Sequence, residues 1–387
     1  MIKQAELGLN SRSEANPFDE DGFLPLITAP VYSVVDDKNY EFFLKHGIRV
    51  CMPRKVCGEN TVNWMGKEAY FEAVSLDEFI ADYIESDQGM VYGYGGEYIK
   101  TTVLIDTASG NIPKLHNAIR KAKEIYSNKL VIMAGNVGSL EAFVELAEIN
   151  INYIRVGIGG SLNGCNTTKN TGVGQKNLYK LLKKCYKWKT KTGSNVKIVA
   201  DGISTYCKWC EDKYGFLDNG YACINKLLQV SDMVMIGSLF AQVLESAGKK
   251  GFYHVYESGE EIKDLGIVSH NTNPNLLLET FNKNRLYVKY SGMSTTEAQK
   301  KYKWVGDKDA SRSWLPEDFG KNPADFPELV IKPSEGSTKW LPVRFLLDEW
   351  LNGSQNQDEY PYLMGWVNSI KSAMSYVSAK TLKEFKI

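Results

Sequence analysis

The sequence has no run of apolar residues long enough to cross a membrane, and it carries no net charge. None of its 387 residues lies in a stretch that approaches the ~20 apolar residues of a membrane helix. Lysine and arginine number 46, as do aspartate and glutamate, which argues against a general nucleic-acid or membrane-surface binder. The first residues, Met1 to Gly22, are polar and lack the apolar core of a signal peptide. We therefore expect neither a membrane nor a nucleic acid as partner.

Cysteine and histidine are too scattered for a disulfide scaffold or a zinc enzyme. The seven cysteines are odd in number and diluted through a long chain, so the expected location is the reducing cytoplasm. Cys207 and Cys210 have C-x-x-C spacing, but no second pair at ligand spacing accompanies them. The four histidines form no H-E-x-x-H motif. These patterns do not favour a zinc site.

The chain also lacks internal repeats, and no G-x-G-x-x-G motif follows its first expected strand, which removes the main support for a Rossmann fold. Instead, short apolar runs alternate with helical patterns. Eight runs are expected strands: Leu24–Thr28, Ile48–Met52, Met90–Tyr92, Thr102–Ile105, Leu130–Ala134, Tyr153–Val156, Val196–Ala200 and Met233–Ile236. This alternation predicts an α/β fold, a (β/α)8 TIM barrel, with a doubly wound open sheet as the alternative, because a sequence pattern cannot show closure.

Beyond the eighth run the alternation stops. We expect one TIM-barrel catalytic domain over residues 1–387, with an insertion at 249–285 and a flap-like insertion at 306–335 that is rich in proline. Residues 364–387 return to a helical pattern and predict a C-terminal helix.

Chemistry in such a barrel lies where strands end and helices begin. The polar and glycine residues at these positions are too varied to serve packing alone. They are Ala29-Pro30, Arg54-Lys55, Asp106, Asn136, the loop 157–174, Asp201-Gly202 and Gly237-Ser238.

The loop 157–174 is the most distinctive stretch of the chain. It holds six glycines, which let the backbone approach an anion closely, and Cys165 in their midst. A thiolate held in such a loop is a candidate nucleophile, although a buried core cysteine is the alternative.

Several motifs, in the same order as in the family, resemble the IMP dehydrogenase/GMP reductase family. They are Ile132–Val137, Val156–Gly159, Ala200–Gly202, Met235–Ala241 and Tyr290–Ser294. The segments Cys165–Gly174 and Asp106–Gly110 are more similar to the reductase branch. The chain leaves no room for the paired (CBS) regulatory domain of many dehydrogenases. It departs from the family at Ile203, where a second glycine is usual, and at Ala29–Tyr32.

The resemblance implies NADPH-dependent reductive deamination of GMP to IMP and ammonia, through a thioimidate between Cys165 and purine C2. It assigns a proton relay to Thr167 and an acid/base role to Glu245. The alternatives are an IMP dehydrogenase, which converts IMP and NAD to XMP, and a purine-nucleotide-binding protein without turnover.

The expected binding residues follow from strand-end position and from the same resemblance. Those for the substrate are Asn136, Gly160, Ser161, Asp201, Gly202, Gly237, Ser238, Tyr290, Gly292 and Met293. Those for the cofactor are Asp106, Ala108, Ser109, Gly110 and Lys55, with Arg54 beside the last. By analogy, a monovalent cation such as K⁺ could bind the backbone of Gly157, Gly159 and Cys165, and the protein is expected to be a homotetramer.

Overall fold

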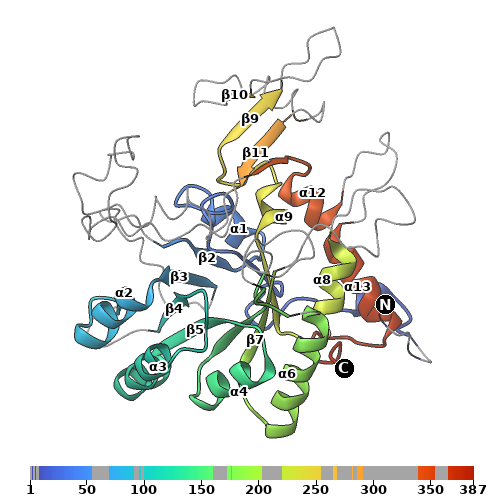
Figure 1. Ribbon diagram of the computed structural model, residues 1–387. Coiled ribbons are helices and arrows are strands. Elements are labelled where there is room, and N and C mark those ends of the chain that lie inside the picture. The colour runs from blue at the N-terminus through green and yellow to red at the C-terminus, as the bar shows by residue number, and fades with distance from the viewer. Residues whose placement is uncertain are drawn as a thin grey trace, which may run out of the picture.

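The computed structural model describes residues 8–54, 69–90, 100–159, 172–175, 177–202, 220–253, 265–267, 286–290, 339–353 and 365–387, and the single residues 2, 5, 96 and 281. Eight parallel strands form the central sheet (Figure 1). They are β1 (Leu26–Thr28), β2 (Val50–Met52), β3 (Tyr70–Val74), β4 (Thr101–Asp106), β5 (Leu130–Val137), β6 (Tyr153–Val156), β7 (Lys197–Asp201) and β8 (Met233–Ile236).

The sheet closes on itself. Its strand order is β1-β8-β7-β6-β5-β4-β3-β2, so β1 and β2 lie at the two ends. The Thr28 N–H donates to the carbonyl of Arg49 over 2.9 Å, and the Arg49 N–H donates to the carbonyl of Leu26 over 3.0 Å. These bonds join the first strand to the second and confirm the predicted TIM barrel.

All eight strands send side chains into the barrel. The interior cluster is apolar and consists of Ile27, Cys51, Phe71, Ala73, Leu104, Val131, Met133, Tyr153, Val199, Met233 and Met235. The alternate residues of each strand pack outward against the helices, in a second and larger cluster. Burial raises the pKa of the Cys51 thiol well above its usual range, so this cysteine is a packing residue.

Helices surround the barrel (Figure 1). They are α1 (Tyr40–Lys45), α2 (Leu76–Ile80), α3 (Pro113–Tyr126), α4 (Leu140–Glu148), α6 (Leu178–Thr192), α8 (Tyr221–Leu228), α9 (Ser238–Ala241), α12 (Leu347–Asn352) and α13 (Trp366–Tyr376). A π-helical turn, η2 (Ala81–Glu85), follows α2, and short 3₁₀ turns are η1 (Arg12–Glu14) and η3 (Ser127–Lys129). Local sequence sets their ends. At the start of α4, the side chain of Ser139 accepts the N–H of Ala142, and at the start of α6 the side chain of Asn177 accepts the N–H of Lys180. Gly193 ends α6 in the left-handed conformation.

The expected third strand was wrong. β3 is Tyr70–Val74, whereas Met90 lies in a bend and residues 91–92 fall outside the described part. Phe71 and Ala73 point into the barrel, while Tyr70, Glu72 and Val74 are half-buried on the other face. The charged Glu72 inside an alternating run hid this strand from a search for continuous apolar runs.

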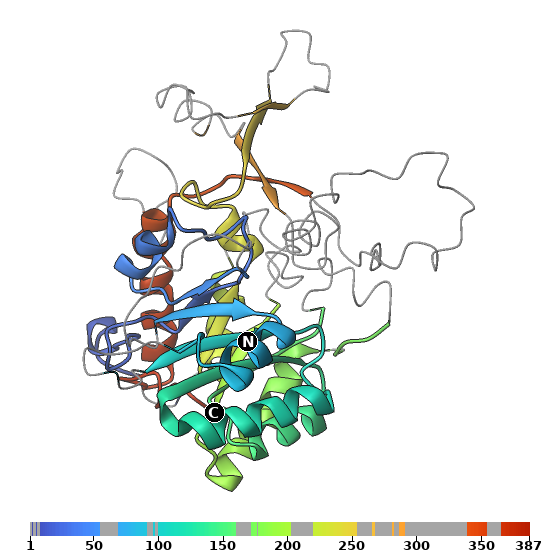
Figure 2. The same ribbon diagram turned by 90° about the vertical axis from the view of Figure 1, so that its left-hand side faces the viewer.

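A second sheet is formed by two strands within the first expected insertion, one strand between the two insertions and one strand after the second. It is antiparallel, with the order β10-β9-β11-β12, and its strands are β9 (Lys250–Tyr253), β10 (Leu265–Ile267), β11 (Leu286–Tyr290) and β12 (Lys339–Pro342). Figures 1 and 2 show β9 and β11 projecting away from the barrel near α9 and α12. The sequence analysis expected only irregular structure here.

The C-terminal helix is shorter than expected. α13 ends at Tyr376, and Ser378 has a positive φ of 61° that turns the chain back toward the barrel. Trp366 begins the helix, fully buried and stacked on Trp350 of α12, and the 3₁₀ turn η1 packs against α13. The tail therefore remains part of the fold after the helix ends.

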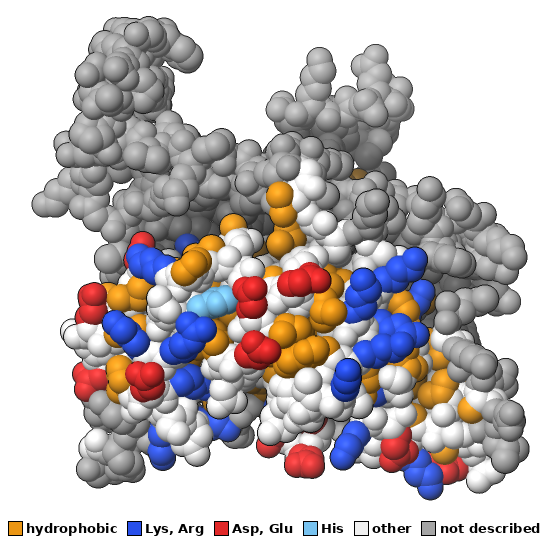
Figure 3. All heavy atoms as spheres, turned by 60° about the horizontal axis from the view of Figure 1, so that its bottom comes forward, with side chains coloured by type: hydrophobic (Ala, Val, Ile, Leu, Met, Phe, Trp, Pro, Cys, Tyr) orange, Lys and Arg blue, Asp and Glu red, His pale blue; other side chains and the backbone are white. Residues whose placement is uncertain are grey.

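The outer surface is mixed in charge. Figure 3, which brings the lower side of Figure 1 forward, shows basic and acidic side chains interspersed, with small hydrophobic areas between them. Among the described residues, no helix is both long and apolar enough to span a membrane.

Candidate active site

Polar side chains meet where β4 to β7 end. Asp106 is the last residue of β4, Asn136 lies next to the end of β5, and Asp201 is the last residue of β7. Arg155, in the middle of β6, joins them. Because carboxyl ends of parallel strands meet at one rim of a barrel, residues up to 95 positions apart come together here.

Arg155 is the centre of this cluster, and the sequence analysis did not single it out. Its Nη1 lies 2.7 Å from Oδ1 of Asp106, and its Nη2 lies 2.8 Å from Oδ2 of Asp201. Burial alone would lower the pKa of Arg155, but the two carboxylates outweigh it and raise the pKa further. A charged residue inside an otherwise apolar strand was the signal that could have found it.

Asn136 holds Asp201 from the other side. Its Nδ2 donates to Oδ2 of Asp201 over 2.7 Å and to the carbonyl of Gly157 over 2.8 Å. Within the described residues, every side-chain donor to Asp201 bonds Oδ2. Oδ1 is therefore the oxygen through which Asp201 can accept hydrogen bonds from a ligand.

Arg54 completes the cluster beside Asp106. Its Nη2 lies 3.4 Å from Oδ2 of Asp106 and also donates to the carbonyl of that residue. Its buried Nε has no hydrogen-bond partner within the described residues. An unsatisfied donor on a buried cation costs free energy, so this atom fits an anionic or carbonyl oxygen of a bound group.

The loop after β4 is packed tightly against β5. The N–H of Gly110 donates to the carbonyl of Asn136 over 2.9 Å. A Cβ atom at Gly110 would lie 2.7 Å from Cα of Gly135, so only glycine fits. The ring Nε2 of His116 lies 3.2 Å from the carbonyl of Gly110. These contacts fix the segment that contains the predicted cofactor residues Ala108 and Ser109.

The turn after β8 meets the end of β11. A Cβ atom at Gly237 would lie 3.1 Å from the hydroxyl oxygen of Tyr290 and 3.4 Å from Cβ of Ala29. Ser238 follows directly and begins α9. Three of the predicted substrate residues, Gly237, Ser238 and Tyr290, are thus brought together, although Tyr290 is 52 positions further along the chain than Ser238.

A hydrogen bond holds the two ends of the glycine-rich loop 157–174 together. The side-chain Oε1 of Gln175 accepts the N–H of Ile158 over 2.8 Å, which joins the two stems of the loop. Gly157 packs so closely on β7 that an added Cβ would lie 2.2 Å from the carbonyl of Asp201. Seven predicted residues lie outside the described part: Lys55, Gly160, Ser161, Cys165, Thr167, Gly292 and Met293.

Glu245 lies apart from the Arg155 cluster in its described contacts. Its Oε2 accepts the N–H of Leu347, the first residue of α12, over 3.0 Å. Burial raises the pKa of Glu245, although that hydrogen bond and the nearby charges of His46 and Lys250 oppose the shift. The described contacts give this carboxylate a role at the start of α12.

The described residues contain no group of three histidine, cysteine or carboxylate side chains that could hold a metal ion. Of the backbone atoms expected to bind K⁺, the carbonyl of Gly157 accepts the Asn136 amide, and Cys165 lies outside the described residues.

Comparison with known proteins agrees with this arrangement. Residues 99–275 match the profile of the IMP dehydrogenase / GMP reductase domain. The GMP reductase of Delftia acidovorans is 31% identical over 263 residues, which are 66% of this chain and 72% of that protein. This chain belongs to the IMP dehydrogenase/GMP reductase family.

Two further relatives match smaller shares of the chain. The GMP reductase of Variovorax paradoxus is 32% identical over 58% of this chain, and the match spans 63% of that protein. The inosine-5'-monophosphate dehydrogenase of Borreliella burgdorferi is 30% identical over 47% of this chain and 39% of that protein. The family model, matched over residues 99–275, covers β4 to β8 and with them Asp106, Asn136, Arg155 and Asp201, but not Arg54.

Proposed function

We propose that this protein is an NADPH-dependent GMP reductase, which converts GMP to IMP and ammonia. The observation that carries the proposal is the extent of similarity: relatives named GMP reductase match 58% and 66% of the chain, against 47% for the relative named as a dehydrogenase. The cluster of Asp201, Asn136 and Arg155 supports it, because these groups can hold a polar nucleotide at the barrel mouth.

In the proposed reaction Cys165, as a thiolate, attacks C2 of GMP to form a thioimidate, and ammonia leaves. Thr167 passes a proton to the departing amine, and Glu245 acts as the acid/base for that relay. Overall, GMP, NADPH and two protons give IMP, ammonium and NADP⁺. A thiolate suits both halves of this reaction: as a good nucleophile it forms the bond to C2, and as a good leaving group it departs when that bond breaks after a hydride is added to C2, which releases IMP and restores the Cys165 thiolate.

Different residues of the proposed site bind different parts of the nucleotide. Oδ1 of Asp201 accepts the ribose hydroxyls, while Arg155 and Asn136 hold Oδ2 in place. Gly237, Ser238 and Tyr290 bind the 5′-phosphate together with Gly160 and Ser161. Gly202 lies beside Asp201, and Gly292 and Met293 lie along the base.

The nicotinamide cofactor is assigned to the rim at β2 and β4. Reduced nicotinamide, when bound, supplies the hydride to C2. The unsatisfied Nε of Arg54 supports this placement, since it offers a charged donor to a cofactor oxygen. The segment of Ala108, Ser109 and Gly110 closely follows Asp106 in the chain, and both arginines hold the carboxylate of Asp106. Lys55 would add charge for the cofactor phosphates, and K⁺ at Gly157, Gly159 and Cys165 is part of the same proposal.

The alternative is an IMP dehydrogenase, which shares the covalent step and belongs to the same family. Two mixtures decide between the reactions by absorbance of reduced nicotinamide: GMP with NADPH, and IMP with NAD⁺. Loss of absorbance with ammonia release in the first supports the reductase. A gain in the second identifies a dehydrogenase. No change in either, with GMP still bound, identifies a binding protein without turnover.

A Cys165→Ala variant tests the nucleophile. We expect unchanged GMP affinity and no turnover, whereas full activity would overturn the mechanism. We further propose that the protein is a cytoplasmic homotetramer, and light scattering of the full chain tests the oligomeric state.

A further inference from the structure

A cavity lies at the end of the barrel opposite to Asp201. It has a volume of about 450 Å³ and is bordered by the residues that begin three strands: Tyr153 of β6, Lys197 of β7 and Met233 of β8. The C-terminal tail covers one side through Leu382, Lys383 and Lys386. Since barrel chemistry takes place at the carboxyl ends of strands, this cavity plays no part in the proposed reaction.

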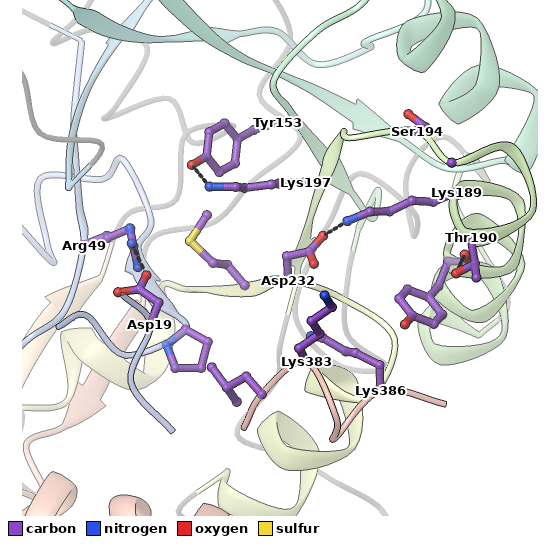
Figure 4. Close-up of a pocket in the computed structure, with 15 residues that line it drawn as sticks. Asp19, Arg49, Tyr153, Lys189, Thr190, Ser194, Lys197, Asp232, Lys383 and Lys386 are labelled. Carbon is purple, nitrogen blue, oxygen red and sulfur yellow. Dashed lines mark hydrogen bonds and ion pairs between the residues drawn. The ribbon is translucent and has the colours of Figure 1, made fainter. Parts of the chain in front are cut away.

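The cavity carries an excess of positive charge. Its lining includes five cationic side chains and two carboxylates: Arg49, Lys189, Lys197, Lys383 and Lys386 against Asp19 and Asp232. The carboxylates are already engaged, Asp19 by Arg49 and Asp232 by Lys189. Figure 4 shows these two pairs on opposite sides of the cavity, with Lys197 above and the two tail lysines below.

Lys197 and Lys386 donate hydrogen bonds to neutral groups. Nζ of Lys197 donates to the hydroxyl of Tyr153 over 3.0 Å and lies 5.0 Å from the centre of that ring. Nζ of Lys386 donates to the carbonyls of Leu228 and Ser231. Burial lowers the pKa of Lys386 to about 8, although the nearby charge of Asp232 opposes the shift.

Apolar and aromatic surfaces complete the lining. Tyr186 presents a half-buried ring and Leu382 adds apolar contact, whereas Tyr153 is only 1% exposed. A cavity of several hundred Å³ with a mostly apolar wall and a few polar groups is typical of a site for a small organic ligand. The added lysines select ligands with negative charge.

We propose that this cavity is a second ligand site, which binds a phosphorylated small molecule that carries a ring. Its phosphate groups bind between Lys197, Lys383 and Lys386. Its ring packs on Tyr186. β6 and β7 run from this site to Arg155 and Asp201, so the two sites are the two ends of the same strands.

Isothermal titration of the full protein with inorganic pyrophosphate and with uridine 5′-triphosphate tests the site. We expect both probes to bind, the nucleotide more tightly. The variant Lys197→Gln/Lys383→Gln changes two exposed residues and should weaken binding about tenfold or more, since charge-assisted hydrogen bonds are lost.

Two controls locate the binding. Lys129→Gln removes an exposed lysine just before β5, outside the cavity lining, and should change nothing. Arg54→Gln removes a cation at the other end of the barrel and should also leave the affinity unchanged. The proposal is overturned if neither probe binds at millimolar concentration, or if Arg54→Gln abolishes binding while the double variant does not. Equal affinities for the two probes would overturn the assignment of a ring.

Discussion

Arg155 and Asp106 form an ion pair of 2.7 Å with each side chain only 8% exposed. Asp201 and Arg54 extend this pair into a chain of alternating charge at the barrel mouth. Two cations and two anions balance, and each side chain is held in one orientation by its neighbours. Removing one member leaves an uncompensated buried charge, which is far more costly than the loss of a surface pair.

The first prediction concerns Arg155→Met. It leaves Asp106 and Asp201 without their shared cation, so we expect a loss of about 3–5 kcal/mol in the free energy of unfolding, measured by urea denaturation. Arg120→Met, at an exposed position of α3, is the control and should change stability by about 0.5 kcal/mol or less. Equal effects of the two substitutions would contradict the structural role of the cluster.

The second prediction compares two glycines that both have positive φ. Gly157 has φ of 133° and would place a Cβ 2.2 Å from the carbonyl of Asp201, whereas Gly193 has φ of 70° and open space around it. Gly193→Ala should cost about 1 kcal/mol from backbone strain alone. Gly157→Ala adds a clash and should cost about 3 kcal/mol or more. Thermal unfolding of both variants measures the difference, and a milder effect at Gly157 would show that the contact with β7 is not tight.

The third prediction concerns the pH dependence of Glu245. Its pKa is raised in the folded protein, so its contribution to stability is full below its unfolded value near 4.5 and declines as the pH rises through the folded value. Glu245→Gln keeps an acceptor for the Leu347 N–H but does not ionise. The variant should therefore gain stability relative to the wild type between pH 4 and pH 7.

Denaturant titrations at those two pH values give the measurement, with the exposed Glu124→Gln as control. Activity of the same variant separates two roles for Glu245. Loss of turnover with intact stability supports the acid/base role, and full turnover would leave only the contact with α12.

The fourth prediction concerns Trp366, whose Nε1 donates to Oδ1 of the buried Asn225 over 3.0 Å. Trp366→Phe leaves that oxygen unpaired and shortens a fully buried side chain, so we expect a loss of about 2–4 kcal/mol. Trp188→Phe replaces a half-buried indole, which packs edge-on to Phe143, by a smaller ring. It should lower the free energy of unfolding by less than Trp366→Phe does. If Trp188→Phe is the more harmful, the network at the start of α13 is not a major source of stability.

Seven of the eight barrel strands were predictable because each is a short apolar run. The third was not, since Glu72 breaks the apolar pattern of Tyr70–Val74 and the barrel tolerates a half-buried charge on its outer face. The small sheet was also missed. Its strands β11 and β12 pair across a long intervening segment, and such pairing depends on contacts that no local pattern records.

The sequence could indicate the polar residues of the candidate site that lie at the ends of strands, but not the one that lies within a strand. Asp106, Asn136 and Asp201 follow apolar runs, and in the structure Arg155 and Asn136 link them through hydrogen bonds. Arg155 lies inside such a run, and its partners are 49 and 46 positions away. The favourable partners of a buried charge become known only when the strands are placed side by side.

The register of β11 and β12 brings two distant points of the chain together. Tyr290 lies directly opposite Lys339, so the residues before and after the segment 291–338 are neighbours in the small sheet. Closing a loop depends weakly on its length, at about 0.6 kcal/mol per doubling, and a two-residue Asn-Gly turn could replace the whole segment as a hairpin. Such an excision should leave the barrel's unfolding transition in place, yet it would delete Gly292 and Met293. A shortened chain that folds normally but no longer binds a purine nucleotide would thus divide the sequence into a part that holds the barrel together and a part that serves its ligand.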